Sequence, residues 1–352
     1  MKPRVLFVGR TRYALPLAGP LARKWDALAD VFELRVLASG TGTDPRFRLV
    51  PPRAFDGPRF YLELPARVAR EMRAFRPDVV VAESVYEGVA VLLARPRAKV
   101  VVEVHGDWRT STRLYGSPAR AALDPVADRL ATWAVRRADA VRAVSEFTAS
   151  LVRGVGREPA AVFTAYTDLS AFSGPVVPVP EEPRALFVGV LERYKNVAGL
   201  GSAWRRVDVP GATLRVIGDG PESDVVEGLG VRWDRRVEQT EIARALDEAR
   251  VLLLPSQSEG LPRVVVEASL RGRAAVATRA GGTPEIVEDG VTGLLVERGD
   301  MEAFARAVER VLRDRDLAQR LGDAARDRAE RFLTTPEQFA ESFRALVESV
   351  LA

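Results

Sequence analysis

Short runs of β-branched residues alternate with helix-like stretches along this chain, and the alternation occurs twice. In the first half, strands are predicted over residues 5–8, 31–37, 79–81, 100–104 and 140–143. In the second half, they are predicted over residues 185–188, 213–217, 251–254 and 274–277. Several runs, such as VVV at 79–81, are apolar without alternation, which is typical of strands covered on both faces. The pattern therefore predicts an α/β fold with parallel, doubly wound sheets.

Between the predicted strands, apolar residues recur at the spacing of helices. Helices are predicted over residues 64–75 and 119–137 in the first half, and over residues 196–205, 240–249, 263–271, 284–288, 301–313 and 317–331 in the second. Residues 174–183 carry four prolines, which neither a helix nor a central strand accommodates, so this segment is predicted to link two domains. The predicted domains span residues 1–173 and 184–335, and a last helix within residues 336–352 can pack on either of them.

Composition excludes several classes of protein. Of 352 residues, 47% are hydrophobic and 28% are charged, which is typical of a globular chain with room for two cores. Cysteine is absent and His105 is the one histidine, so disulfides, thiolate zinc sites, cysteine nucleophiles and multi-histidine metal sites are excluded. Arg10 and Arg12 interrupt the first apolar run too early for a signal peptide, and no run reaches the ~18 residues of a membrane span. We therefore expect a cytoplasmic location.

Charge is distributed unevenly between the two halves. Residues 1–172 hold 27 Lys and Arg against 18 Asp and Glu, a net charge of +9, whereas the remainder holds 25 against 30, a net charge of −5. A basic N-terminal half favours an anionic partner, which is a phosphate-bearing substrate, an acidic membrane surface or nucleic acid. The alternative is that the arginines are merely solvated. Peripheral contact with the inner face of an anionic membrane stays open, since no segment is basic and apolar enough to decide it.

The loop after the predicted strand at residues 251–254 carries the densest set of candidate site residues. It reads PSQSEGLP, and a buried helix is predicted to follow from Arg263. Ligands of parallel sheets bind at the carboxyl ends of the strands, where a helix N-terminus also favours anions. Glu259 in the loop and Glu267 on the helix would lie on either side of such a ligand. Alternatively, Glu267 forms a surface ion pair with Arg263 or Arg271, and Glu259 is solvated.

The run SEGLPRVVVEASLRGRAAVATRAGGTPEIVEDGVTGLLV resembles the donor-site signature of the retaining glycosyltransferases of family 4, which have the GT-B fold. In that signature a Glu is followed, after seven residues, by a second Glu and then by G-G-x-P-E-I-V. Glu259, Glu267 and residues 281–287 match these positions. The resemblance covers essentially the whole chain. It implies two Rossmann-like domains facing a central cleft, with the sugar donor on the second domain and the acceptor on the first.

The resemblance also implies roles for individual residues of this loop. The first Glu of the signature lies beside the transferred sugar and the second binds the ribose hydroxyls, and these roles fall to Glu259 and Glu267. Backbone N–H groups of the loop hold the sugar and the diphosphate; their positions are Gly260, Leu261, Pro262, Arg263 and Val264. Residues 281–287 also read as an ordinary helix start, with a proline and an acidic residue in its first turn, so we do not count them among the contacts.

A second donor element is similar to the family segment G-R-L-x-x-x-K-G, whose Arg and Lys neutralise the donor diphosphate. The chain reads GVLERYKN here, so Gly189 and Lys195 match and Val190 stands at the Arg position. Arg193 is the candidate replacement for that cation. The stretch VRWD matches the place where the family's backbone binds the nucleobase, and Arg232 is the candidate there. The preceding VIGDGP is expected to be scaffold rather than contact.

Candidate acceptor residues lie in the first half of the chain. His105 directly follows the predicted strand at residues 100–104, and the resemblance places a His here against the transferred sugar and near the acceptor. A structural role is the alternative for a single histidine. Gly9 ends the first strand where the family has a glycine-rich loop, but this chain continues RTRY, which favours an anionic acceptor. The predicted acceptor-binding residues are Gly9, Arg10, Arg12, Tyr13, His105 and Asp107.

Together these features predict a retaining glycosyltransferase that moves a hexosyl group from a nucleoside-diphosphate sugar to a hydroxyl acceptor. The acceptor is a sugar, a lipid-linked sugar or a small molecule, and the donor is a UDP-sugar first and GDP-mannose next. Glu259, His105 and Lys195 are the predicted catalytic residues, in a front-face mechanism that the resemblance implies. The one Asp-x-Asp, at residues 314–316, falls between two predicted helices, so no metal or other cofactor is expected. Lys195, loop N–H groups and a helix N-terminus are left to stabilise the leaving diphosphate.

Two other functions stay open. A nucleotide-sugar epimerase of the GT-B fold would use the same donor pocket without an acceptor. A non-catalytic sugar- or nucleic-acid-binding protein would account for the basic N-terminal half and for Val190. The transferase, by contrast, requires no nucleic acid. The donor sugar, the base, the acceptor and the oligomeric state do not follow from the sequence.

Overall fold

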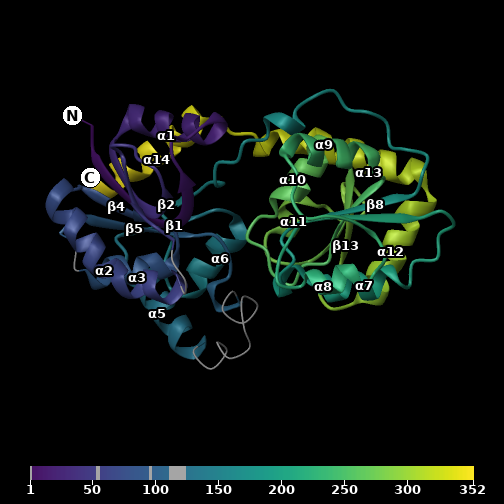
Figure 1. The fold of residues 1–352 in the computed structure, drawn as a ribbon, viewed down its shortest axis with the longest axis horizontal. Coiled ribbons are helices and arrows are strands. Elements are labelled where there is room, and N and C mark those ends of the chain that lie inside the picture. Colours follow the sequence, from purple (N-terminus) through teal and green to yellow (C-terminus); the bar gives the residue numbers. More distant parts are fainter. Residues whose placement is uncertain (1, 53–55, 95–96, 111–123) are drawn as a thin grey trace. The chain divides into compact units, whose positions relative to one another are not determined.

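The structure is a computed structural model that describes residues 2–52, 56–94, 97–110 and 124–352. The chain folds into two compact units, and its C-terminal helix returns to the first of them (Figure 1). Of the described residues, those within 2–109, 124–168 and 334–352 form the N-terminal unit, and Thr110 with residues 169–333 forms the C-terminal unit. Each unit has one parallel sheet of its own, so the predicted doubly wound α/β fold is confirmed.

The sheet of the N-terminal unit has, within the described residues, seven strands in the order β3-β2-β1-β4-β5-β6-β7. They are β1 (Arg4–Ala14), β2 (Glu33–Thr41), β3 (Phe47–Val50), β4 (Val79–Ala82), β5 (Lys99–Val104), β6 (Ala140–Ala143) and β7 (Ala161–Val162). The order reverses between β1 and β4, whose pairing ends at Val8 and Ala82. The chain therefore leaves these two strands in opposite directions, which opens a crevice at their carboxyl ends.

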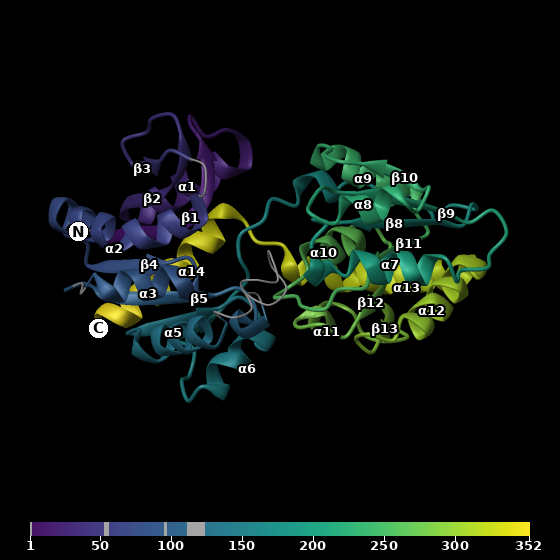
Figure 2. The same ribbon diagram turned by 60° about the horizontal axis from the view of Figure 1, so that its bottom comes forward.

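Helices cover both faces of this sheet because its strands are apolar on both sides. Helices α1 (Gly19–Val31) and α14 (Pro336–Leu351) lie on one face, and α2 (Asp56–Phe75), α3 (Val85–Leu93), α5 (Asp124–Arg137) and α6 (Glu146–Gly154) pack on the other. Figure 2 shows α3 and α5 side by side. The C-terminal helix buries Phe339 and Phe343, and the Phe343 ring lies 5.7 Å from that of Phe7 in β1. Helix α14 is therefore a structural part of the N-terminal unit.

The sheet of the C-terminal unit has, within the described residues, six strands in the order β10-β9-β8-β11-β12-β13. They are β8 (Arg184–Val188), β9 (Thr213–Ile217), β10 (Arg232–Asp234), β11 (Val251–Leu254), β12 (Ala274–Thr278) and β13 (Gly293–Val296). The helices are α7 (Val197–Trp204), α8 (Ser223–Glu227), α9 (Gln239–Glu248), α10 (Arg263–Leu270), α11 (Thr283–Ile286), α12 (Met301–Arg313) and α13 (Arg315–Ala329), with short 3₁₀ turns η2 (Ser170–Phe172), η3 (Arg193–Lys195) and η4 (Glu330–Phe332). Here the strand order reverses between β8 and β11.

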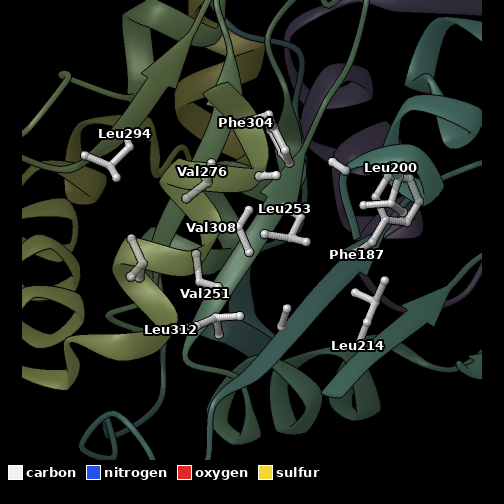
Figure 3. Close-up of a cluster of buried hydrophobic side chains, with 14 of the residues drawn as sticks. Phe187, Leu200, Leu214, Val251, Leu253, Val276, Leu294, Phe304, Val308 and Leu312 are labelled. Atoms are coloured by element: carbon white, nitrogen blue, oxygen red, sulfur yellow. The ribbon is translucent and has the colours of Figure 1, made fainter. Parts of the chain in front are cut away.

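Alternate residues of these strands enter two cores, one on each face of the sheet. Phe187 and Leu253 pack with Leu200 of α7 and Phe304 of α12 on one face, as Figure 3 shows. Their neighbours in sequence, such as Leu252, pack on the other face against α9 and α10. Burial on both faces explains why these strands read as unbroken apolar runs.

The helices are amphipathic, and their apolar faces pack against the sheets. In α12, buried residues recur at Phe304, Val308 and Val311, while charged residues occupy the opposite face. Within the described ranges, no helix of either unit combines the length and the apolar character needed to cross a bilayer.

Some predicted boundaries differ from the structure. The strand predicted over residues 31–37 is β2 (Glu33–Thr41), because α1 continues through Val31 and Phe32 caps it by donating its N–H to the Leu28 carbonyl. The helix predicted over residues 119–137 is α5, and residues 119–123 lie outside the described residues. Three helices, α1, α3 and α6, were not predicted, and neither were the shorter elements α8, β3, β7, β10 and β13. A run of about four or five residues carries too little periodicity to be recognised in a sequence.

Residues 174–183 were expected to form a linker, but in the structure they pack on the C-terminal unit. Val179 is buried in its core, and its N–H donates to Gln319 Oε1 at 2.8 Å. The carbonyls of Val177 and Pro180 accept from Arg273 and Arg250, two buried guanidinium groups. An extended, proline-rich backbone presents free carbonyls, and buried arginines need acceptors, so the segment is held along its length.

Candidate functional site

The reversal of strand order in the C-terminal unit places two loops beside each other. Gly189 follows β8 directly, and residues 255–262 follow β11. The two loops are tied by backbone and side-chain hydrogen bonds. The Gln257 N–H donates to the Tyr194 carbonyl at 2.7 Å, and Asn196 Nδ2 donates to the Pro255 carbonyl at 3.1 Å. These bonds hold the loops after β8 and β11 beside each other.

Lys195 and Glu259 form a buried ion pair between these two loops. Lys195 ends the turn η3, and its Nζ donates to Glu259 Oε1 at 2.6 Å. Ser256 Oγ donates to the same oxygen at 2.7 Å. Each of the two charged residues is only 8% exposed, whereas Oε2 of Glu259 has no hydrogen-bond partner among the described residues. The carboxylate of Glu259 is thus held by one of its two oxygens.

A pair of glycines fixes the backbone that carries Glu259. A Cβ on Gly281 would lie 1.7 Å from the Glu259 carbonyl oxygen, and one on Gly282 would lie 2.1 Å from that of Gly260. Gly281 also has a φ of +55°, which side chains rarely adopt. The G-G of the sequence motif therefore lets the turn after β12 support the loop of Glu259. This role was missed by the sequence reasoning, which treated the segment as a helix start.

Glu267 lies on helix α10, one turn after Arg263, and the two residues form an ion pair. Arg263 Nε donates to Glu267 Oε1 at 2.5 Å. Glu267 is buried and Arg263 is half exposed, so this pair is not the plain surface ion pair considered from the sequence. Burial raises the pKa of Glu267, and the Arg263 charge opposes that rise. Helix α10 follows Pro262, its N-cap, whose carbonyl accepts from the Val265 N–H at 3.0 Å, so Arg263 and Val264 are the residues of the first turn whose N–H groups have no acceptor within the helix.

A pocket of about 600 Å³ lies at the carboxyl ends of β8 and β9. Its lining residues are Val188, Gly189, Val190, Ile217, Gly218, Asp219, Arg235, Arg236, Val237, Glu238 and Ile242. Gly218 belongs to the predicted scaffold stretch, and a Cβ there would lie 1.8 Å from the Gly189 carbonyl oxygen. The glycines therefore bring the ends of β8 and β9 together as the floor of the pocket.

Two predicted donor contacts, Arg232 and Arg193, are not among the residues that line this pocket. Arg232 is in β10, where it is largely exposed and lies 3.5 Å from Asp234, and it does not line this pocket; Arg235 and Arg236 do. Arg193 is exposed and its charge acts on Glu222, whose pKa is raised by burial and lowered in part by Arg193. Val190 lines the pocket at the position of the family's arginine.

The predicted Asp-x-Asp at residues 314–316 is a helix start. Asp314 is the N-cap of α13, and its Oδ1 accepts from the Leu317 N–H at 2.8 Å. Asp314 lies between α12 and α13, and not in a loop that follows a strand.

In the N-terminal unit, Gly9 and Glu83 meet at the reversal between β1 and β4. Glu83 follows β4, and its N–H donates to the Val8 carbonyl at 2.9 Å. A Cβ on Gly9 would lie 1.8 Å from Glu83 Oε2, so only a glycine leaves room for this carboxylate. Thr11 Oγ1 donates to the same oxygen at 3.3 Å. Gly9 therefore acts through Glu83, a residue that the sequence reasoning did not select.

His105 is the outermost of three charged or ionisable side chains that are linked in series by hydrogen bonds, and the other two, Glu103 and Arg142, are buried. Its Nε2 lies 3.0 Å from Glu103 Oε2, and Arg142 Nη1 donates to Glu103 Oε1 at 2.6 Å. Arg142 in turn donates to the carbonyls of Phe163 and Thr164 at 2.9 Å. Burial would raise the pKa of Glu103, but Arg142 and His105 outweigh it and lower that pKa to about 2. The contact with Glu103 orients the imidazole of His105, which stays partly exposed at the carboxyl end of β5.

The remaining predicted acceptor residues divide between surface and core. Arg10 and Arg12 are exposed, and the Arg10 guanidinium lies 5.9 Å from the Tyr61 ring. Asp107 binds the N–H and the side chain of Arg109. Tyr13 was expected at the acceptor site but is only 4% exposed, with its ring against Trp25 and Phe47. The register shift in β1 between Val8 and Arg12 turns this residue into the aromatic core.

Two Rossmann-like units, each with polar side chains at the reversal of its strand order, define the GT-B class of glycosyltransferases. Solved structures of this class match the whole chain. A sucrose-phosphate synthase of Thermosynechococcus elongatus has a TM-score of 0.80 at 19% identity, covering 99% of both chains. The HepE protein of Anabaena, solved in complex with UDP-glucose, has a TM-score of 0.70 at 20% identity, covering 97% of this chain and 99% of that one.

Family models and curated relatives agree with this class. The model described as Glycosyltransferase Family 4 matches residues 21–167, and the one described as Glycosyl transferases group 1 matches residues 174–328. The chain therefore belongs to the family 4 glycosyltransferases. It is 33% identical over 160 residues to a sulfoquinovosyl transferase of Arabidopsis thaliana, covering 44% of this chain and 31% of that protein. It is 25% identical over 296 residues to an N-acetyl-α-D-glucosaminyl L-malate synthase of Bacillus anthracis, covering 78% of this chain and 75% of that protein.

Proposed function

We propose that this glycosyltransferase moves a hexosyl group from a nucleoside-diphosphate sugar to a hydroxyl acceptor, with the donor on the C-terminal unit and the acceptor on the N-terminal unit. The observation that carries the proposal is the buried pair of Lys195 and Glu259 at the reversal between β8 and β11. Ligands of open parallel sheets bind at such reversals. Family membership supplies the reaction class.

The donor we propose is a UDP-sugar, with GDP-mannose as the next candidate. The pocket beside Gly189 supplies a place for the nucleotide, and Arg235 and Arg236 line it. Guanidinium groups bind phosphate and carbonyl acceptors through several N–H donors. A structural relative, HepE, is described in complex with UDP-glucose, which supports uridine as the first base to test.

The proposed mechanism retains the anomeric configuration by a front-face displacement. The bond between the anomeric carbon and the diphosphate oxygen breaks, and the bond to the acceptor oxygen forms on the same face of the sugar. The acceptor proton passes to the departing phosphate oxygen. In this reaction Glu259 positions the sugar rather than attacking it, because Lys195 and Ser256 already hold Oε1 in place.

The negative charge that develops on the diphosphate needs preorganised donors. Lys195 supplies an ammonium group, and Arg263 and Val264 at the start of α10 supply N–H groups without acceptors within the helix. On this proposal no metal ion is needed. Arg193, which is exposed near the end of β8, is the proposed second cation in place of the family's arginine at Val190.

The direct test is thermal unfolding of the full chain with UDP, GDP, ADP or TDP, each with EDTA present. A ligand at about 100 times its dissociation constant adds roughly 2.7 kcal/mol to the free energy of unfolding. Selective stabilisation by UDP, together with UDP release from a UDP-sugar, is the expected result. Stabilisation that requires added magnesium would contradict metal independence. No stabilisation by any nucleotide, with steep salt-dependent binding to DNA or RNA instead, would favour the binding-protein alternative.

A further inference from the structure

Three consecutive residues after β8 each bond to the loop that follows β11. The carbonyl of Tyr194 accepts a backbone N–H of that loop at 2.7 Å, and Lys195 Nζ donates to Glu259 Oε1 at 2.6 Å. Asn196 Nδ2 donates to the Pro255 carbonyl at 3.1 Å. The first bond belongs to the backbone and the second to the proposed catalytic pair. The third is made by a side chain outside that pair, and its role in the site is not yet accounted for.

Asn196 stands at the junction of η3 and α7, where its amide group joins three segments. Its φ of +57° lies in the left-handed region, which Gly and Asn adopt more readily than other residues. Its Oδ1 accepts from the Gly199 N–H at 3.2 Å, which makes Asn196 the N-cap of α7. Its Nδ2 bonds to Pro255 and also lies 3.6 Å from Sδ of Met301, the first residue of α12. A glycine would fit this backbone but could form none of these side-chain contacts.

Gly199 leaves the space that the amide of Asn196 occupies. A Cβ on Gly199 would lie 2.2 Å from Asn196 Nδ2 and 2.6 Å from its Oδ1. Gly199 lies within α7, and helices favour alanine over glycine, so helix propensity gives no reason for a glycine here. The close approach of the amide does.

The bond from Asn196 joins the two backbone segments that carry the ion pair. Lys195 and Glu259 are 64 residues apart in sequence, so their contact depends on how the turn and the loop are placed against each other. Asn196 is the neighbour of Lys195, and Pro255 is the first residue of the loop of Glu259. A displacement of reacting groups by about 1 Å can lower a rate by about 10²-fold. Support of this kind therefore matters for the rate.

We propose that Asn196 is a positioning residue of the donor site, which keeps Lys195 and Glu259 in place through its bond to the Pro255 carbonyl. The proposal rests on the proposed transferase function and refines it. From the sequence, Asn196 was predicted only to begin a helix. It does not line the pocket beside Gly189, so its loss should lower the rate more than the affinity for the nucleotide.

The test compares Asn196→Gly with the wild-type full chain. Glycine adopts a positive φ without strain, so the change removes the amide and leaves the backbone its conformation. The rate measured is nucleotide release from UDP-glucose or GDP-mannose with water as the acceptor, below the Tm of every variant. We expect kcat to fall about tenfold. The Kd for the released nucleotide, from isothermal titration calorimetry, should change by less than about threefold.

A matched control separates positioning from stability. Asp314 is the N-cap of α13 in the same unit, and its Oδ1 accepts from the Leu317 N–H. Asp314→Gly therefore removes a helix cap as Asn196→Gly does, but away from the loops of the ion pair. It should lower the Tm by a similar amount and leave kcat within about a factor of two of the wild type.

A second variant reaches the same defect without changing Asn196. Gly199→Ala adds a methyl group where the amide lies, so kcat should fall as it does in Asn196→Gly. Its control is Gly154→Ala at the end of α6, where no heavy atom outside the immediate chain lies within 4 Å of an added Cβ. This control should keep the kcat of the wild type.

Three results would overturn the inference: a kcat in Asn196→Gly within about a factor of two of the wild type, an equal loss of kcat in Asp314→Gly, or a loss of nucleotide affinity as large as the loss of kcat. If Asn196→Gly does not fold, equal kcat values in Gly199→Ala and Gly154→Ala overturn it. In each case the wild type still releases nucleotide, so the proposed function stands. If the wild type releases none from either donor, the proposed function fails and the inference falls with it.

Discussion

The two units reverse their strand order in the same way, but the side chains at the two reversals interact differently. In the C-terminal unit, Lys195 Nζ and Ser256 Oγ both donate to Glu259 Oε1, at 2.6 and 2.7 Å. In the N-terminal unit, Lys24 and Glu83 affect each other's pKa without an ion pair within 4.0 Å. A paired site is rigid before its ligand arrives. The Glu83 carboxylate, which accepts from Thr11 Oγ1 at 3.3 Å, is held less firmly than that of Glu259.

Glycines support both reversals, but against different neighbours. Gly281 and Gly282 make room for the backbone of the Glu259 loop, whereas Gly9 makes room for the side chain of Glu83. A backbone contact fixes the course of a loop. A side-chain contact fixes one functional group and leaves the loop free to differ. The reversal in the C-terminal unit is therefore built around a fixed loop, and the reversal in the N-terminal unit around a single carboxylate.

The largest expected effect comes from Glu103→Gln, which removes the carboxylate that contacts both Arg142 and His105. Arg142 would remain buried with its carboxylate partner lost, a change that typically costs about 3–5 kcal/mol. Urea unfolding of the variant measures this loss directly. A decrease of less than about 1 kcal/mol in the free energy of unfolding would show that the ion pair of Glu103 and Arg142 does not stabilise the N-terminal unit.

Glu259→Ala tests the paired site of the other unit. Loss of a preorganised electrostatic group typically lowers kcat by about 10²–10³-fold. UDP release in the presence of acceptor measures this, with Glu297→Ala, an exposed carboxylate, as the control. A variant that keeps kcat within about a factor of three of the wild type, while still folded, would contradict the assignment of Glu259.

Acid should weaken the N-terminal unit through Glu103. The pKa of Glu103 in the folded protein is lowered to about 2 from 4.5, so its stabilising contribution is complete above pH 4.5 and is lost as the pH falls towards 2. Glu83, whose pKa is raised, acts in the opposite sense, since its protonation favours the folded state. Unfolding free energies measured across this range should fall less steeply in Glu103→Gln than in the wild type. Equal slopes would refute the shift.

The smallest expected effect separates two arginines near the nucleotide pocket. Arg235 lines the pocket, although its side chain is largely exposed, so Arg235→Ala should weaken nucleoside-diphosphate binding by about two- to fivefold. Arg232 does not line it, and Arg232→Ala should change the affinity by less than about twofold. Isothermal titration calorimetry compares them. The reverse order would restore Arg232 as the contact predicted from the sequence.

The sequence by itself determined the repeated α/β architecture and the residues of the paired site. Unbroken apolar runs such as that of β11 identify strands covered on both faces, and the loop of Glu259 with the helix of Glu267 is contiguous in the chain. Lys195 lies 64 residues earlier and was found only through its family motif.

Only the tertiary structure decided what surrounds the other reversal. Glu103 and Arg142 lie on neighbouring strands but 39 residues apart in sequence, and no local pattern says that their side chains form an ion pair. The burial of Tyr13 depends on a shift of register within β1, which periodicity does not reveal. Charged residues within apolar strands, as at Glu103, were the one available signal. Local spacing specifies elements, whereas the partners of a buried charge are set by how distant elements pack.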